Sequence, residues 1–225
     1  MDCNILFEDK HILVAVKPQG IPVQPDKTGD ADLLSALENC CHQPLGLVHR
    51  LDRPVGGVMI FAKTKKAEAF LSKELQEGQL KKMYLTVLCG KLPQEKGILK
   101  DFLRKNTRTN LSEVVPEGAK GSKKAILQYA RLGERETEYG CLTLAKITLF
   151  TGRHHQIRVQ TSHAGVPIWG DKKYHPSFRK KGRTEIALWS YCLSGIHPET
   201  KEGFAFSALP EKEPFSLFLE EIGNL

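Results

Sequence analysis

One stretch in the first third of the chain places a charged turn between two core-forming segments. Leu47 and Val48 are apolar, and residues 58–62 form a continuous apolar run that predicts a buried strand. Between them lies a polar loop that contains two arginines, an aspartate, a proline and two glycines. A segment built only for packing has no need of such charges, so this loop is a candidate functional site, and Asp52 is its acid.

Arg50 and Arg53 flank this aspartate in the sequence. Neighbouring positive charge lowers the pKa of a carboxyl group and keeps it ionised, which is the state that a nucleophilic aspartate requires. A structural Arg-Asp ion pair that closes a hairpin explains the same residues equally well. Both interpretations are open from these residues alone.

The spacing of the loop resembles the active-site signature of the RluA-type pseudouridine synthases, HRLDxxxxG, because residues 49–52 read His-Arg-Leu-Asp and Gly57 follows Asp52 by five positions. Two further segments agree with this resemblance. Residues 17–23 are similar to the family's KPxG element, and residues 151–158 resemble its TGRxHQIR element. The resemblance spans nearly the whole chain, since it also includes residues 82–85 and the pair His197-Pro198.

The resemblance implies the pseudouridine synthase fold, in which a mixed, mostly antiparallel sheet is bent around a central catalytic cleft that contains the aspartate loop. The irregular order of the expected strands and helices independently favours the α+β class over a doubly wound fold. The expected fold is therefore α+β, with Asp52 in the cleft.

The resemblance also implies an enzyme that isomerises uridine to pseudouridine at specific sites in ribosomal or transfer RNA. Three catalytic residues follow by family position. Asp52 is the carboxylate near the anomeric carbon, as a nucleophile or as a base in a glycal route, and Arg158 pairs with it and holds it ionised. Tyr84 stacks on the uracil, although an ordinary strand tyrosine with its hydroxyl in water is the plainer interpretation of the residue by itself.

Four further residues are expected to bind the substrate, and they are Arg50, Lys17, Arg153 and Gln156. Because the target base is buried in RNA structure, it has to flip out at a cost of roughly a few kcal/mol, and Arg50 is placed to fill the gap that it leaves. The chain departs from the family habit at Gln160, where a histidine is usual, and at Gly56, where a serine is common. These departures concern fine RNA contacts rather than the chemistry.

Length and charge are compatible with this interpretation but do not decide it. A chain of 225 residues can be one large domain or two tightly fused halves. From the resemblance we expect a single catalytic domain over residues 1–225, without an appended N-terminal RNA-binding domain. The net charge of +7 and the sequence pI near 9.1 suit a polyanionic partner.

Several classes of site and location are disfavoured by the sequence. The six cysteines lack the CxxC spacing of a zinc site, and a metal site on the histidines at 154, 155 and 163 is disfavoured because they lack the i, i+4 spacing of a helical zinc pair. No GxGxxG or GxxxxGK loop predicts a nucleotide cofactor. Without a signal sequence or an apolar run of about 20 residues, we expect a soluble, cytoplasmic monomer that needs no cofactor, binds RNA and does not bind membranes.

Outside the signature segments the pattern predicts ordinary elements. Asp30 or Asp32 caps a short helix and Thr64 caps a stronger one. Residues 104–124 are polar and basic and predict a loop or a ragged hairpin, which is either a grip on RNA phosphates or a solvated surface. The remaining expected elements are strands over residues 12–16, 81–88, 125–132, 139–150, 186–193 and 204–209, a helix that contains residues 154–163, and a terminal helix over residues 214–222.

Two other function classes are compatible with parts of the pattern. A non-catalytic RNA-binding module would be basic too, but it would have no use for Asp52, Tyr84 and Arg158 together. A glycosidic-bond hydrolase would use acids for sugar chemistry, but it usually needs a pair of carboxylates, and no second acid matches the signature.

Overall fold

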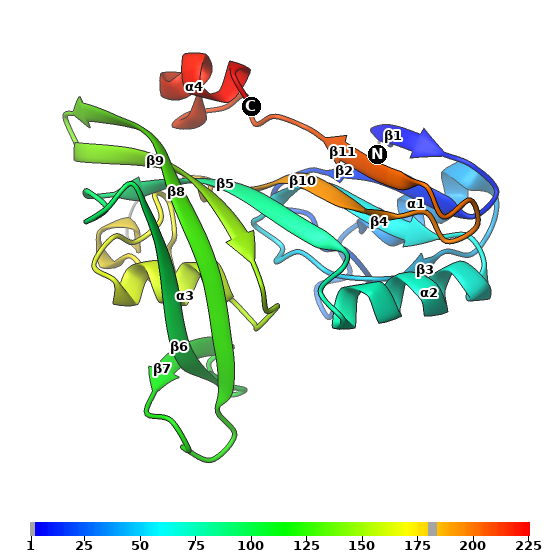
Figure 1. The fold of residues 1–225 in the computed structure, drawn as a ribbon, viewed down its shortest axis with the longest axis horizontal. Helices are drawn as coiled ribbons and strands as arrows, with labels where there is room; N and C mark the ends of the chain where they lie inside the picture. Colours follow the sequence, from blue (N-terminus) through cyan, green and yellow to red (C-terminus); the bar gives the residue numbers. More distant parts are fainter. Residues whose placement is uncertain (1–2, 180–183) are drawn as a thin grey trace. The chain divides into compact units, whose positions relative to one another are not determined.

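The computed structural model describes residues 3–179 and 184–225. These residues form eleven β-strands and four α-helices, with two short 3-10 helices (Figure 1). Most strand pairings are antiparallel, and β4 with β10 is parallel. The predicted α+β class with a mixed, mostly antiparallel sheet is therefore confirmed, whereas its bend around a cleft stays a prediction. No helix of the described residues is long and apolar enough to cross a membrane.

The chain divides into two compact units, which are described separately below. The first unit consists of residues 1–83 and 189–209, and the second of residues 84–188 and 210–225. The expectation of one catalytic domain over residues 1–225 stays a prediction.

The first unit is built on two antiparallel strands, β2 (Ile12–Lys17) and β4 (Gly56–Ala62). Every residue of both strands is buried, as the continuous apolar run at residues 58–62 predicted. Beside β4 runs the parallel strand β10 (Leu188–Ile196). The unit is completed by β1 (Ile5–Glu8) on β2, β3 (Gly46–Leu47) on β4 and β11 (Gly203–Ser207) on β10.

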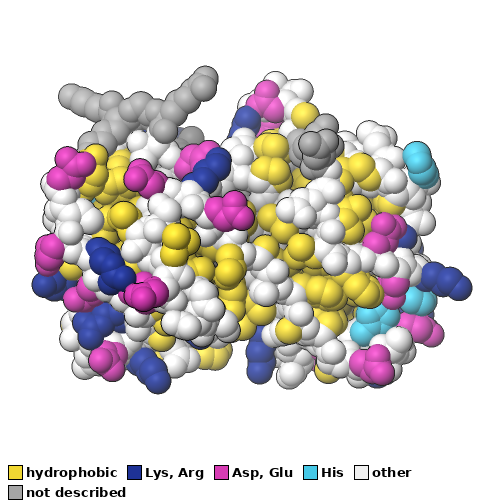
Figure 2. All heavy atoms as spheres, turned by 90° about the horizontal axis from the view of Figure 1, so that it is seen from above, with side chains coloured by type: hydrophobic (Ala, Val, Ile, Leu, Met, Phe, Trp, Pro, Cys, Tyr) yellow, Lys and Arg dark blue, Asp and Glu magenta, His cyan; other side chains and the backbone are white. Residues whose placement is uncertain are grey.

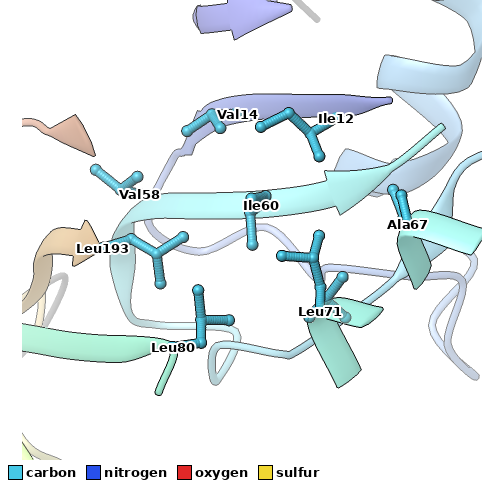
Figure 3. Packing of buried hydrophobic residues seen from close by; sticks show 10 residues of the cluster. Ile12, Val14, Val58, Ile60, Ala67, Leu71, Leu80 and Leu193 are labelled. Carbon is cyan, nitrogen blue, oxygen red and sulfur yellow. The ribbon is translucent and has the colours of Figure 1, made fainter. Parts of the chain in front are cut away.

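Both predicted helices of this unit have the predicted caps. The Asp32 carboxylate accepts a hydrogen bond from the Ser35 amide at the start of α1 (Leu33–Cys41), and the Thr64 hydroxyl accepts one from Ala67 at the start of α2 (Lys65–Gln76). Figure 3 shows Leu71 of α2 pointing toward Ile60 of β4 in the core cluster. This core fixes the strand that follows the aspartate loop.

In the second unit the strands have the spatial order β5, β9, β8, β6, β7. The predicted loop or ragged hairpin over residues 104–124 is a regular hairpin of β6 and β7, followed by a turn into β8. Figure 1 shows β6 and β8 as a long pair of strands with β7 near their tip. The bounds are β5 (Lys81–Cys89), β6 (Lys96–Asn106), β7 (Leu111–Val115), β8 (Lys123–Thr137) and β9 (Gly140–Leu149).

The helix expected around residues 154–163 is shorter than predicted. It is α3 (Gln156–His163), and His155 precedes it in the left-handed region with a φ of 54°. The reason is the Gln156 side chain, whose Oε1 accepts hydrogen bonds from the Arg153 amide at 3.0 Å and from the Thr151 hydroxyl at 2.8 Å. This contact closes a turn where the helix was expected. The unit also contains η1 (Pro176–Phe178), η2 (Phe215–Phe218) and α4 (Leu219–Gly223).

Candidate active site

Asp52 lies in the turn between β3 and β4, and two glycines connect this turn to β4. Gly57 has a φ of 117°, and a Cβ atom there would lie 2.2 Å from the Ser190 carbonyl oxygen of β10. A Cβ atom on Gly56 would lie 2.4 Å from the Trp189 ring. Only glycine fits at Gly57, and Trp189 accounts for the glycine at position 56.

Lys17 connects the first signature segment to the aspartate loop. Its side chain is fully buried, and Nζ donates hydrogen bonds to the carbonyl oxygens of Pro18 at 2.9 Å, Ile21 at 2.6 Å and Arg53 at 3.0 Å. An ammonium group has three donors, and these three carbonyls use all of them. Lys17 therefore positions the loop, and its expected contact with the substrate has no support in this geometry.

The charge of Lys17 is coupled to the charge of Asp52. Burial lowers the pKa of Lys17 to about 7, while the negative charge of Asp52 raises this pKa and the positive charge of Arg53 lowers it further. A positive charge that interacts with Asp52 within this unit is thus a buried ammonium. The sequence suggested the flanking guanidinium groups for this role.

The Arg53 guanidinium binds a different acid. Its Nη2 donates to the Asp30 carboxylate, Nε donates to the Gly20 carbonyl at 2.9 Å, and Nη1 donates to the Thr28 hydroxyl at 3.2 Å. Arg-Asp ion pairs of Arg53 therefore do brace this loop, and their acids are Asp30 and, at 3.8 Å, Asp26. Arg50, by contrast, has an exposed side chain, which is compatible with the substrate contact predicted for it.

The pH dependence of stability tests the state of Lys17. In the unfolded chain a lysine titrates near 10.5 and in the fold Lys17 titrates near 7. Between these values the unfolded state binds more protons, so the contribution of Lys17 to the unfolding free energy rises with pH across this window. We expect Lys17→Met to be less stable by roughly 2–5 kcal/mol, because three buried carbonyls lose their donor.

Urea unfolding of wild type and Lys17→Met, at about pH 6 and about pH 9, measures both effects. All other titrating groups are shared, so their contributions largely cancel in the difference. The stability gap should widen toward the higher pH. A gap that stays constant would mean that the fold does not lower the pKa of Lys17, and a gap that narrows would mean that the fold raises it.

Tyr84 lies on β5 in the second unit with only 5% of its surface exposed. Alternation along β5 places Met83, Leu85 and Val87 on one side of the strand, and Tyr84 and Thr86 on the other. The structure buries the other side too, because Thr86 is fully buried and donates to the Ala187 carbonyl at 2.8 Å. Tyr84 is therefore not an ordinary surface tyrosine, and its role at the uracil stays a prediction.

Arg158 of α3 is buried and makes a two-pronged contact with Asp171. Nε donates to Oδ2 at 2.8 Å and Nη2 to Oδ1 at 2.7 Å, with 4% and 0% of the two side chains exposed. Such a fork fixes the plane of the guanidinium group. The two donors of this fork are Nε and Nη2. The pairing of Arg158 with Asp52 stays a prediction.

Tyr174 supports the same guanidinium from another side. The Arg158 Cζ atom lies 5.3 Å from the centre of the Tyr174 ring, a distance that allows a cation–π interaction. The Tyr174 hydroxyl accepts a hydrogen bond from the Ser112 amide of β7 at 2.7 Å and contacts His155 Nδ1 at 2.8 Å. Asp171 and Tyr174 were missed at the sequence level, because no spacing relates them to Arg158.

The other two residues predicted to bind substrate lie at the start of α3. Gln156 is buried, and its Nε2 donates to the Ile126 carbonyl at 3.1 Å, so it shapes the turn, and a substrate contact has no support there. Arg153 is exposed, and its Nε donates to the Lys124 carbonyl at 2.9 Å, which leaves the predicted role open. Among the described residues no group of three or more His, Cys, Asp and Glu side chains could hold a metal ion.

The predicted site residues thus fall into two groups, one in each unit. The first unit contains Lys17 at the end of β2 and Arg50 and Asp52 between β3 and β4, and the second contains Tyr84, Arg153, Gln156 and Arg158.

Comparison with known proteins identifies the family. A family model described as RNA pseudouridylate synthase matches residues 11–163. The chain belongs to this family.

Bacterial relatives agree with this assignment. An uncharacterized RNA pseudouridine synthase of Mycoplasma pneumoniae is 30% identical over 99% of this chain and 70% of its own length. The ribosomal large subunit pseudouridine synthase C of Pasteurella multocida is 32% identical over 92% of this chain and 64% of its own length. The chain therefore spans about two thirds of the length of these relatives. At the level of the family, the RluA-type resemblance and the expected enzyme class are confirmed.

Solved structures show the same fold. Human RNA pseudouridylate synthase domain containing 1 superposes with a TM-score of 0.79, at 21% identity over 95% of this chain and 85% of that one. Human RNA pseudouridylate synthase domain containing 4 gives a TM-score of 0.76, at 22% identity over 98% and 93%. The pseudouridine synthase fold expected from the sequence is confirmed by these matches.

Proposed function

We propose that this pseudouridine synthase isomerises uridine to pseudouridine at specific sites in ribosomal or transfer RNA, with the Asp52 carboxylate as the group that acts at the anomeric carbon. The supporting observation is the construction of the aspartate loop. Hydrogen bonds from the buried Lys17 hold the loop, and the chain leaves it through Gly57, where only glycine fits. A loop braced in this way keeps its acid in a fixed position, which catalysis requires.

The reaction breaks the bond between the uracil nitrogen and the ribose, turns the base and joins carbon 5 to the sugar. Asp52 acts as a nucleophile or as a base that removes a ribose proton. In both routes we assign stacking on the uracil to Tyr84 and the filling of the vacated space in the RNA to Arg50. Arg158 holds the Asp52 charge, and Arg153 contacts the RNA.

Tritium release from RNA that contains uridine labelled at carbon 5 tests the proposal. An isomerase has to release this tritium, because carbon 5 exchanges its hydrogen for the bond to the sugar. A non-catalytic RNA-binding module releases none, and a glycosidic-bond hydrolase leaves free base or free sugar instead. RNA from cells that lack the gene is the substrate, and mapping of pseudouridine in that RNA identifies the target site.

Arg158→Lys tests the role of the guanidinium fork. A lysine keeps the positive charge but lacks the planar pair of donors that Asp171 binds. We expect turnover to fall by roughly 10²-fold or more, as is usual when a positioned charge near the reacting group is displaced. Single-turnover tritium release measures this loss, and wild-type turnover by Arg158→Lys would show that the fork is not needed.

A matched control separates this loss from a general effect of the substitution. Arg135 is also paired with a carboxylate, since its Nη2 lies 2.7 Å from Glu221, but 40% of its side chain is exposed. Arg135→Lys should therefore change stability by no more than about 0.5 kcal/mol and leave turnover unchanged.

We propose RNA as the macromolecular partner and the cytoplasm as the location. A monomer without a nucleotide cofactor is the expected working form. Sedimentation of the purified protein and activity after exhaustive dialysis test these last two points.

A further inference from the structure

The chain has a net charge of +7. On the face that Figure 2 shows, Lys and Arg side chains are interspersed with Asp and Glu. A surface that binds single-stranded RNA consists of a local group of cations without acids, next to side chains on which bases can stack.

One face of the strands β6, β8 and β9 has this composition. The opposite face is covered by α3, because Ala125 and Leu127 are fully buried there and Gln160 of α3 donates to Asp101 at 2.7 Å. Side chains alternate between the two faces along a strand, so the even-numbered positions of β6, and those of β8 before its register shift at residues 131–133, point away from α3. We call this second surface the open sheet face.

The strand register gives the neighbours on the open sheet face. Phe150 continues the register of β9 beyond its end, because its amide donates to the Ile126 carbonyl at 3.1 Å. The cross-strand rows of this face are Lys96-Ala130-Lys146, Ile98-Gln128-Thr148, Lys100-Ile126-Phe150 and Phe102-Lys124.

Two large apolar side chains of this face are exposed to solvent. Ile98 is 63% exposed and Phe150 is 57% exposed. A single exposed apolar residue is common in proteins, but Phe150 shares a row with Lys100, on the other side of Ile126. Neighbouring strands are about 4.8 Å apart, so the backbone positions of Phe150 and Lys100 are separated by about 10 Å.

The part of the open sheet face that these four rows cover has charge of one sign. Its eleven positions include four lysines and no Asp or Glu. None of these lysines forms an ion pair with another residue that the structure describes. One row beyond them, toward β7, Arg104 of β6 pairs with Glu113 at 2.9 Å. Lysine is depleted in the cores of protein–protein interfaces, so this composition favours a polyanion over a protein partner.

We propose that the open sheet face binds a single-stranded segment of the RNA substrate, with a base stacked on Phe150 and phosphates contacted by Lys100 and Lys124. An exposed sheet with an aromatic side chain among cations is a surface on which unpaired bases stack. The inference rests on the proposed function in so far as RNA is the substrate.

Fluorescence anisotropy with a labelled single-stranded oligouridine of roughly ten nucleotides tests the stacking. Phe150→Leu keeps an apolar side chain and removes the aromatic face. We expect its affinity to fall roughly five- to 150-fold, which corresponds to about 1–3 kcal/mol for one stacked base. Phe150→Trp should bind at least as tightly as wild type. Leu219→Ala, at a 62% exposed position of α4, is the control without effect.

The salt dependence of the same binding tests the phosphate contacts. In a plot of the logarithm of the binding constant against the logarithm of the salt concentration, each phosphate contact that is removed makes the slope shallower by about 0.7 for a single strand. The double variant Lys100→Ala, Lys124→Ala should therefore lose about 1.4 from this slope. Lys10→Ala, on the exposed turn between β1 and β2, should leave the slope unchanged.

Wild-type affinity of Phe150→Leu together with a wild-type slope of the double lysine variant would overturn the inference. So would light scattering that shows a dimer of the wild type which Phe150→Leu dissociates, because the face would then bind a second copy. Tritium release from the same preparations separates the two proposals. Release without an effect of Phe150 rejects only this inference, and Phe150-dependent binding without release rejects only the isomerase.

Discussion

Asp52→Asn is expected to reduce isomerisation by at least about three orders of magnitude, the scale seen when an enzyme loses its principal reacting group. Asparagine keeps the shape of the side chain and removes the charge, so it cannot attack the anomeric carbon or remove a ribose proton. RNA affinity should stay close to that of the wild type, because the phosphate contacts are unaffected. Single-turnover tritium release beside equilibrium RNA binding measures the two quantities.

The control for Asp52→Asn is the same chemical change elsewhere in the first unit. Glu8 is paired with Lys63 at 2.5 Å near the surface, and Glu8→Gln should leave turnover unchanged. Because the Asp52 charge raises the pKa of Lys17, Asp52→Asn should also lower that pKa further. Appreciable turnover by the pure Asp52→Asn variant would remove Asp52 from the mechanism.

Tyr84→Phe is expected to bind and flip the uridine normally but to release pseudouridine roughly 10²- to 10⁴-fold more slowly, the usual contribution of a positioned general base. After carbon 5 has bonded to the sugar it still carries a proton, and a base has to take it before the product is complete. Tyr84 is nearly buried, so phenylalanine keeps the ring in place and removes only the hydroxyl. Single-turnover product formation, measured beside RNA binding, separates these steps.

Two further variants make this result specific. Tyr84→Ala should also weaken RNA binding, since stacking contributes roughly 1–3 kcal/mol per base. Tyr129 is exposed to the same extent, 5%, on β8, and Tyr129→Phe should turn over like the wild type. If Tyr84→Phe does so too, its hydroxyl is not the base, and Tyr84 has a stacking or structural role.

The sequence was sufficient for the features that depend on neighbouring residues. The buried strand β4 follows from an apolar run, and the starts of α1 and α2 follow from Asp32 and Thr64, because capping involves residues only a few positions apart. The signature around Asp52 was sufficient for the family and its fold. Each of these signals is contained in a short segment and needs no partner from elsewhere in the chain.

Tertiary structure was needed wherever a side chain has two compatible uses. Lys17 and Gln156 look like substrate contacts in their motifs, and only their burial against backbone carbonyls shows that they hold turns in place. The partner of Arg158 within its unit, Asp171, lies thirteen positions along the chain and has no spacing rule. Which donor meets which acceptor depends on the path of the backbone between them, and a linear pattern does not contain that path.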